Sequence, residues 1–133
     1  MSFASFKIPD ALDAFDRAAV RGVSLLFILE SEKDSGGKLR QHGAGPYHSL
    51  LEHPQVQMYG GPVENRPPRA LLHAKAVIVD RQSALVTSAN LSENAISANI
   101  EIGILSTGGD VARVIHAHIM ALIQAGEFVQ IER

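Results

Sequence analysis

The chain has 133 residues, of which 46% are hydrophobic and 20% are charged, and its formal net charge is −2. This composition fits one ordinary globular domain and excludes the uniformly basic surface of a strongly cationic nucleic-acid-binding domain. The chain contains no cysteine, which excludes disulfides and thiolate metal sites. Neither an apolar run long enough to span a membrane nor a signal peptide is evident, so we expect a cytoplasmic protein.

The first 30 residues predict a strand, a helix and a second strand. Residues 1–7 alternate between apolar and polar side chains, as a short strand does. A helix is expected from Pro9 to Gly22, because its apolar residues recur at helical spacing after a favourable start. Val23–Leu29 is almost continuously apolar, which is typical of a strand covered on both faces in a parallel sheet. This order indicates a βαβ unit.

The middle of the chain alternates polar, glycine-rich loops with two short elements. Residues 31–46 carry several basic side chains, which either grip a polyanion or simply face water, and we prefer the second interpretation. Residues 47–53 predict a short helix whose histidines, His48 and His53, are exposed rather than metal ligands. Residues 56–59 predict a strand, after which the chain breaks again.

The stretch Leu71–Val79 carries the clearest functional signal. Its apolar and β-branched residues are typical of a buried strand, but His73 and Lys75 interrupt them. Side chains alternate across a strand, so these two project to the same face, roughly 7 Å apart. The chain then turns at Asp80, which has the opposite parity, and a second apolar run ends in the small polar residues 87–90.

Side chains of these types can hold a phosphoryl group. An imidazole can attack phosphorus or move a proton, an ammonium can neutralise a phosphate oxygen, and a serine and an asparagine can donate hydrogen bonds. The simpler alternative is that His73 and Lys75 are rim residues of a strand whose polar ends reach water. Because the joint pattern H-x-K-x4-D followed by S-x-N is rare by chance, we favour the functional interpretation.

Residues 90–105 predict a short helix followed by a strand. Asn90 can cap the helix at residues 90–97, which would compete with phosphate binding for the same amide. Residues 99–105 alternate, with isoleucines on one face and a polar face that includes Glu101.

A long helix and an edge strand complete the chain. The helix is expected at residues 110–126, with Asp110 as its cap. His116 and His118 would point to different faces of this helix, which makes a paired metal site improbable. Residues 128–131 add a strand, which we expect at an edge of the sheet.

Five residues together resemble the HKD motif of the phospholipase D superfamily: His73, Lys75, Asp80, Ser88 and Asn90. Within the superfamily, LLHAKAVIVD, TSAN and NIEIGIL most resemble the phospholipase-D-like proteins of DISARM-type phage-defence systems. The resemblance is strong over residues 71–105 and weaker over residues 6–30. Thr87 is a departure, because the family usually has glycine there, which puts a close backbone approach in question.

The resemblance implies an α/β fold with a mixed, largely parallel sheet flanked by helices. Residues 1–133 would form a single phospholipase-D-like domain. In the family a strand leads into the first helix, so residues 1–7 resemble the tail of that strand and the domain resembles the C-terminal part of a longer parent.

The resemblance also implies a two-step phosphoryl transfer that requires no metal and no cofactor. His73 would attack phosphorus, and a histidine from a second HKD motif would protonate the leaving oxygen before water hydrolyses the phosphohistidine. Lys75 and Asn90 would stabilise the developing charge, with Ser88 as a lesser donor. Glu101 would orient the catalytic histidine, as the acid of a triad does.

Two further residues are expected to have roles other than catalysis. Asp80 is expected to be structural, accepting hydrogen bonds at the turn. Arg69 either contacts phosphate beside the site or only keeps the surface soluble, with even support for each.

The chain holds one H-x-K-x4-D, whereas the implied mechanism needs two. We therefore expect a two-fold homodimer in which His73 faces His73 of its partner, with a pseudo-dimer inside a longer parent as the alternative. For the substrate, nucleic acid is favoured over phospholipid, because no amphipathic membrane-binding helix is evident. A non-catalytic subunit that binds nucleic acid or other proteins of a defence complex is a third hypothesis.

Overall fold

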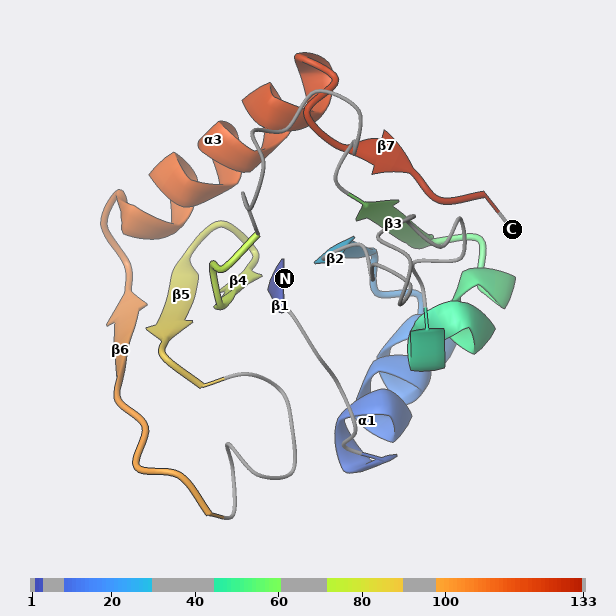
Figure 1. Ribbon diagram of the computed structural model, residues 1–133, viewed down its shortest axis with the longest axis horizontal. Helices are drawn as coiled ribbons and strands as arrows, with labels where there is room; N and C mark the ends of the chain where they lie inside the picture. The colour runs from blue at the N-terminus through green and yellow to red at the C-terminus, as the bar shows by residue number, and fades with distance from the viewer. Residues whose placement is uncertain (1, 4–8, 30–44, 61–71, 90–97, 133) are drawn as a thin grey trace, which may run out of the picture.

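A computed structural model describes residues 2–3, 9–29, 45–60, 72–89 and 98–132 (Figure 1). The elements along the chain are β1 (Ser2–Phe3), α1 (Pro9–Val20), β2 (Leu25–Leu29), the 3-10 helix η1 (Gly45–Glu52), β3 (Val56–Gly60), β4 (Ala76–Val79), β5 (Ser83–Thr87), β6 (Gly103–Thr107), α3 (Val111–Gln124) and β7 (Val129–Gln130). Three sequence expectations lie outside the described residues: the role of Arg69, the role of Asn90, and the helix at residues 90–97. Most of the expected loop at residues 31–46 lies outside them as well.

The strands form one mixed sheet in the order β6-β5-β4-β1-β2-β3-β7. Parallel pairing joins β1 to β2 and β2 to β3, which confirms the βαβ unit. The pairs β1–β4, β3–β7, β4–β5 and β5–β6 are antiparallel. The predicted α/β class with a mixed sheet is confirmed, but its parallel part is confined to β1, β2 and β3.

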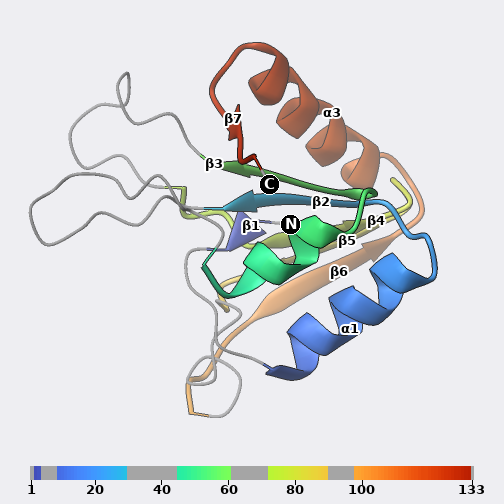
Figure 2. The ribbon, with the colours of Figure 1, turned by 90° about the vertical axis from the view of Figure 1, so that its right-hand side faces the viewer.

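The helices cover opposite faces of the sheet, and each covers a different half of it (Figures 1 and 2). α1 and η1 lie over the half formed by β2 and β3, whereas α3 contacts β4, β5 and β6. His53, the residue after η1, contacts α1 through a 2.8 Å hydrogen bond between its Nε2 and Asp16 Oδ1. His53 is therefore half-buried rather than exposed as expected, while His48 does face solvent.

The core lies beneath α1 and η1. Its centre is Phe27, which is fully buried and stacks edge-on against Phe15, with ring centroids 5.3 Å apart. Tyr47 lies on the other side of Phe27 at 5.7 Å, and burial raises the pKa of its phenol. The other buried members of this cluster are Ala19, Leu29, Leu50, Leu51, Val56 and Met58.

The strand expected at Leu71–Val79 is shorter than predicted. β4 begins only at Ala76, so His73 and Lys75 precede it. The register between β1 and β4 contains the single pair Ser2–Ala76. The expected strand at residues 99–105 likewise begins later, at Gly103.

The hairpin between β4 and β5 turns where the sequence predicted. Asp80 and Arg81 have φ values of 52° and 57°, and the Gln82 amide donates to the Val79 carbonyl at 3.0 Å. This left-handed pair is the geometry that joins two twisted antiparallel strands tightly.

The last helix and the edge strand are both present as predicted. α3 is followed by Gly126, whose φ of 78° suits the residue that terminates a helix. Asp110 occupies the N-cap position, but its side chain makes no capping hydrogen bond and instead pairs with Arg113. No helix in the described ranges is long and apolar enough to cross a membrane.

Candidate functional site

The candidate site lies at the end of the sheet where β4 and β6 begin and β5 ends. The register places Ala76 opposite Val86, and Thr87 opposite Gly103. Because β1 is parallel to β2 and antiparallel to β4, the carboxyl ends of β1, β2 and β3 lie at the same end of the sheet. Ligands of α/β folds bind at the carboxyl ends of parallel strands.

Lys75 is the one buried charged residue among those that the structure describes, with 5% of its surface exposed. Its Nζ donates a hydrogen bond to the His73 carbonyl at 2.8 Å. The Thr87 amide donates to the Lys75 carbonyl at 3.0 Å, which ties this part of the chain to β5. The ammonium is thus held by the backbone, in surroundings where its charge is poorly screened.

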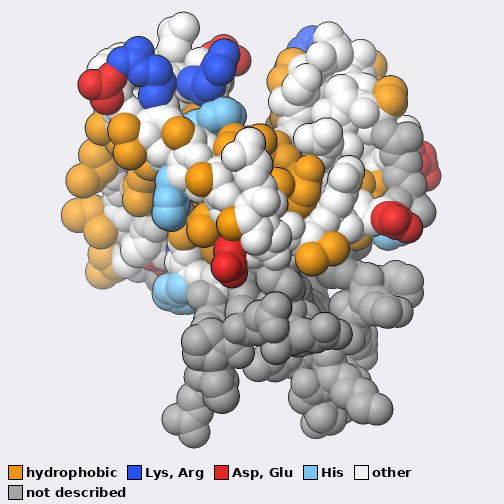
Figure 3. Space-filling model, turned by 90° about the horizontal axis from the view of Figure 1, so that it is seen from above, with side chains coloured by type: hydrophobic (Ala, Val, Ile, Leu, Met, Phe, Trp, Pro, Cys, Tyr) orange, Lys and Arg blue, Asp and Glu red, His pale blue; other side chains and the backbone are white. Residues whose placement is uncertain are grey.

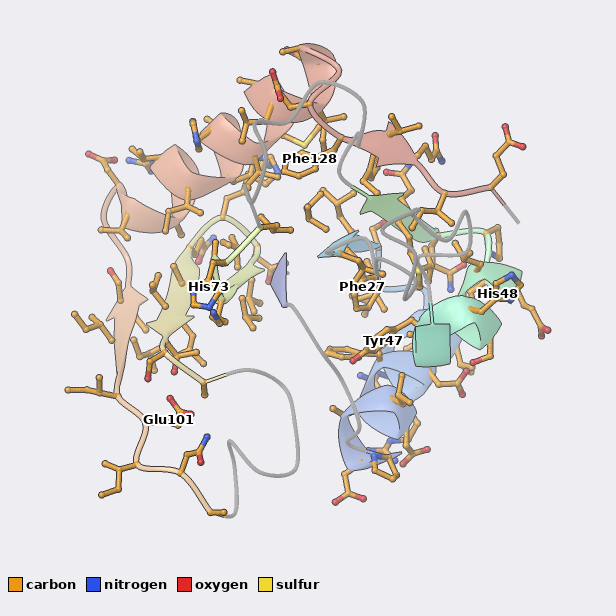
Figure 4. The ribbon with its side chains drawn as sticks, in the orientation of Figure 1. Phe27, Tyr47, His48, His73, Glu101 and Phe128 are labelled. Atoms are coloured by element: carbon orange, nitrogen blue, oxygen red, sulfur yellow. The ribbon has the colours of Figure 1, made fainter. Side chains whose placement is uncertain are left out.

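His73 is exposed, in contrast to Lys75 two residues later. Figure 4 shows its side chain beside β4 and β5, far from His48 on η1. An exposed histidine side chain and a buried lysine side chain thus lie two residues apart, and the lysine is bonded to the histidine's backbone. An accessible nucleophile beside a fixed positive charge is the arrangement that phosphoryl transfer needs.

Ser88 and Glu101 join the end of β5 to the segment that leads into β6. The Ser88 hydroxyl donates to Glu101 Oε2 at 2.5 Å and accepts from the Ile102 amide at 3.1 Å. The Ser88 amide donates to the Ile102 carbonyl at 2.9 Å. Asn99 Nδ2 donates to the other carboxylate oxygen of Glu101 at 3.2 Å.

This network lowers the pKa of Glu101 below the usual value for a glutamate. The hydrogen bond from Ser88 has the largest effect, and the one from Asn99 is next. The positive charge of Lys75 acts in the same direction, whereas desolvation opposes it. The low pKa of Glu101 therefore comes mainly from its two hydrogen bonds, with a smaller contribution from Lys75.

Ser88→Ala is expected to raise the pKa of Glu101 toward that of a free glutamate, because it removes the strongest bond to the carboxylate. A side-chain carboxyl NMR titration measures this shift, with Ser106→Ala on β6 as the matched control. Since the folded pKa is depressed, the stabilisation is present above the unfolded pKa and is lost as pH falls through the folded one. An unchanged Glu101 titration in Ser88→Ala would contradict the network.

The sequence predicted that Glu101 orients His73, but the hydrogen bonds of Glu101 go elsewhere. Its carboxylate binds Ser88 and Asn99, and within the described part of the chain no hydrogen bond joins it to His73. Figure 4 shows the two side chains on separate elements. The orienting role stays a prediction. Sequence reasoning missed Asn99, although it lies two residues before Glu101 on the same polar face.

The departure at Thr87 is accommodated by the neighbouring strand. Gly103 lies opposite Thr87, and a Cβ at Gly103 would be only 3.1 Å from the Thr87 Cβ. Thr87 Oγ1 donates to the Ile102 carbonyl at 3.1 Å and accepts from the Ala89 amide at 3.1 Å. The close approach of the two strands therefore depends on glycine in β6 rather than in β5.

Asp80 lies at the opposite end of β4 from His73, which keeps it away from the candidate chemistry. Its left-handed backbone suits the turn, but its carboxylate makes no hydrogen bond to the residues that the structure describes. The same residues contain no cluster of three or more histidine and acidic side chains that could hold a metal ion.

The α/β fold with a His-Lys pair at this end of the sheet matches a known class of proteins. The family model for the cardiolipin synthase phospholipase-D-like domain matches residues 1–123. The chain belongs to this phospholipase-D-like family.

Curated relatives and solved structures agree with this assignment. The chain is 47% identical over 60 residues to the DISARM protein DrmC of Bacillus paralicheniformis, covering 45% of this chain and 25% of that protein. It is 27% identical over 116 residues to the probable cardiolipin synthase YwiE of Bacillus subtilis, covering 86% of this chain and 21% of that protein.

Two solved structures share the fold. Nuc of Salmonella typhimurium, a phospholipase D family member, superposes with a TM-score of 0.74 at 19% identity, covering 100% of this chain and 80% of Nuc. NucT of Helicobacter pylori gives 0.65 at 22% identity, covering 96% of this chain and 79% of NucT. The matched region thus spans a quarter or less of the two curated relatives, but most of each solved structure.

Proposed function

We propose that this domain is a metal-independent phosphodiesterase that acts on nucleic acid through a phosphohistidine intermediate. The observation that carries the proposal is an exposed His73 side chain two residues from the buried Lys75, whose Nζ donates to the His73 backbone carbonyl at 2.8 Å. Membership of the phospholipase-D-like family supports the same chemistry.

The reaction has two steps. A His73 nitrogen forms a bond to phosphorus while the bond to the leaving oxygen breaks, and a second histidine gives that oxygen its proton. Water then attacks the phosphohistidine, passes a proton back to the second histidine, and the phosphorus–nitrogen bond breaks. Imidazole suits both roles because it titrates near neutral pH.

Lys75 and Glu101 support the reaction electrostatically. The ammonium stabilises the negative charge that develops on the phosphoryl oxygens, and its burial strengthens this effect. The pKa of Glu101 is lowered mainly by its hydrogen bonds from Ser88 and Asn99, and the attraction between its carboxylate and Lys75 is a smaller contribution. Because the Ser88 proton is already donated to Glu101, Ser88 is better suited to fixing this carboxylate than to binding substrate. Asn90 keeps its proposed role as a hydrogen-bond donor to the phosphate.

The second histidine comes from a second copy of the chain. The sequence contains a single H-x-K-x4-D motif, so one copy supplies one His-Lys pair. A two-fold homodimer would bring His73 of each copy to a shared cleft, with one histidine as nucleophile and the other as acid. A second motif in a longer parent chain would serve the same purpose.

Nucleic acid is the favoured substrate because no amphipathic membrane-binding helix is evident in the sequence. The similarity to the DISARM protein DrmC supports this choice, because the sequence motifs resemble those of phage-defence proteins of the DISARM type. A phospholipid headgroup reaction is the second candidate, favoured by the name of the family and of the Bacillus subtilis relative. Both reactions break a phosphodiester bond at the same kind of site.

The test uses purified protein in excess EDTA with single-stranded DNA, double-stranded DNA, RNA and anionic phospholipid vesicles. We expect cleavage of nucleic acid that EDTA does not inhibit, and a radiolabelled phosphoryl group on the protein with the acid lability of a phosphohistidine. Headgroup release from vesicles alone would support the second candidate. A formed dimer that turns over none of the four would indicate a non-catalytic subunit of a defence complex.

A further inference from the structure

Thr87, the last residue of β5, lies in the same cross-strand row as Lys75. The register that pairs Ala76 with Val86 continues by one position to these two residues, and the Thr87 amide donates to the Lys75 carbonyl at 3.0 Å. Side chains of directly opposite residues point to the same face of a sheet and interact there. A half-buried threonine is therefore the cross-strand neighbour of the buried lysine.

Two of the other described cations lie far from this row. Figure 3 shows the Lys and Arg side chains of one face of the molecule, and they gather at the end away from the grey residues. Arg81 in the turn between β4 and β5 and Arg113 in the first turn of α3 lie at the opposite end of the sheet from Lys75. They cannot supplement Lys75 at the candidate site, so the groups beside Lys75 determine the geometry of the charges there.

The Thr87 hydroxyl connects the end of β5 to the segment that leads into β6. Its Oγ1 donates to the Ile102 carbonyl at 3.1 Å and accepts from the Ala89 amide at 3.1 Å. A hydroxyl has one proton, so the bond to Ile102 uses it. The bond from Ala89, two residues later, closes the local turn that serine and threonine side chains form. Thr87 thus fixes the backbone on both sides of Ser88.

Ser88 is the residue that this turn holds. Its amide donates to the same Ile102 carbonyl at 2.9 Å, and its Oγ accepts from the Ile102 amide at 3.1 Å. Its hydroxyl proton goes to Glu101 Oε2 at 2.5 Å. Because Ser88 is exposed, these hydrogen bonds rather than packing set the direction of its side chain.

Gly103 provides the space that the Thr87 side chain occupies. A Cβ at Gly103 would lie 3.1 Å from the Thr87 Cβ and 3.3 Å from its Oγ1, both closer than ordinary contacts. A larger residue in β6 would therefore displace the hydroxyl. The position of Oγ1 is thus specified by both strands.

We propose that Thr87 is a positioning residue of the candidate active site, whose hydroxyl holds Ser88 and, through Ser88, the Glu101 carboxylate in place. The inference rests on the proposed function, because it assigns a role in the same reaction. Thr87 acts through Ser88 rather than on the phosphoryl group, since its own proton is already donated to Ile102. A misplacement of about 1 Å can lower a catalytic rate about 10²-fold, so small shifts of this network matter.

The test compares Thr87→Val, which keeps the branched shape but lacks the hydroxyl, with Thr87→Ser, which keeps the hydroxyl. Thr107→Val, the same substitution at the other end of the β5–β6 pair, is the matched control. In Thr87→Val, amide hydrogen exchange of Ala89 should be at least about tenfold faster, because the acceptor is gone. The pKa of Glu101, followed by carboxyl NMR titration, should rise toward that of a free glutamate.

Kinetics on the best nucleic-acid substrate connect this network to the reaction. We expect Thr87→Val to lower kcat at least about tenfold while KM stays within about twofold, because the hydroxyl positions groups that act in the transition state. Thr87→Ser and Thr107→Val should match the unmodified chain in exchange, titration and kcat. Circular dichroism of each variant checks that the fold is unchanged.

Unchanged Ala89 exchange or an unchanged Glu101 titration in Thr87→Val would overturn the proposal. Full kcat in that variant, or a Thr87→Ser variant that behaves like Thr87→Val, would overturn it as well. An unmodified chain that cleaves no phosphodiester would instead contradict the proposed function. The exchange and titration results then decide by themselves whether Thr87 holds Ser88 and Glu101 in place.

Discussion

His73→Asn is expected to lower the rate of phosphodiester cleavage at least about 10³-fold, because asparagine can neither attack phosphorus nor carry the proton. The His73 side chain is exposed, so the free energy of unfolding should change by no more than about 0.5 kcal/mol. Initial rates on the best substrate and urea denaturation measure the two quantities. His48→Asn, an exposed histidine on η1, is the control and should keep full activity.

The same variant tests the shared site. When His73→Asn is mixed in excess with the unmodified chain and allowed to exchange, mixed dimers should be inactive, and activity should fall below that of the same amount of unmodified chain alone. Activity that stays proportional to the unmodified chain would mean that each copy acts independently. If the His73→Asn variant alone keeps its activity, His73 is not the nucleophile.

Phe27→Ala is expected to destabilise the fold by about 3–5 kcal/mol, the usual cost of truncating a fully buried aromatic residue. The ring has no exposed surface and contacts Phe15 and Tyr47, so its loss leaves a cavity between α1 and η1. This is a large part of the 5–15 kcal/mol that stabilises typical domains. Urea denaturation followed by circular dichroism measures the difference.

Val20→Ala is the control for this prediction, because Val20 is 70% exposed at the end of α1. Its effect should stay within about 0.5 kcal/mol. If Phe27→Ala costs less than about 1 kcal/mol, the core is not centred on this ring, and the placement of α1 over β2 would be wrong.

Much of the candidate site was predictable because it is local in the sequence. His73 and Lys75 are two residues apart, so any extended backbone brings them together, and the turn at Asp80 follows from the hairpin that joins two apolar runs. The hydrogen bonds of Glu101 were harder to predict from the sequence. Its partner Ser88 is 13 residues away, and their contact depends on how β5 and β6 pair.

The sequence by itself determined the elements and the motif, because hydrophobic periodicity and short-range spacing are properties of neighbouring residues. It was sufficient for α1, β2, β3, α3 and β7, and for the H-x-K pattern. Only the tertiary structure decided which charge is buried and where the carboxylate binds. These features depend on strand order and register, which bring distant segments together and which no local pattern encodes.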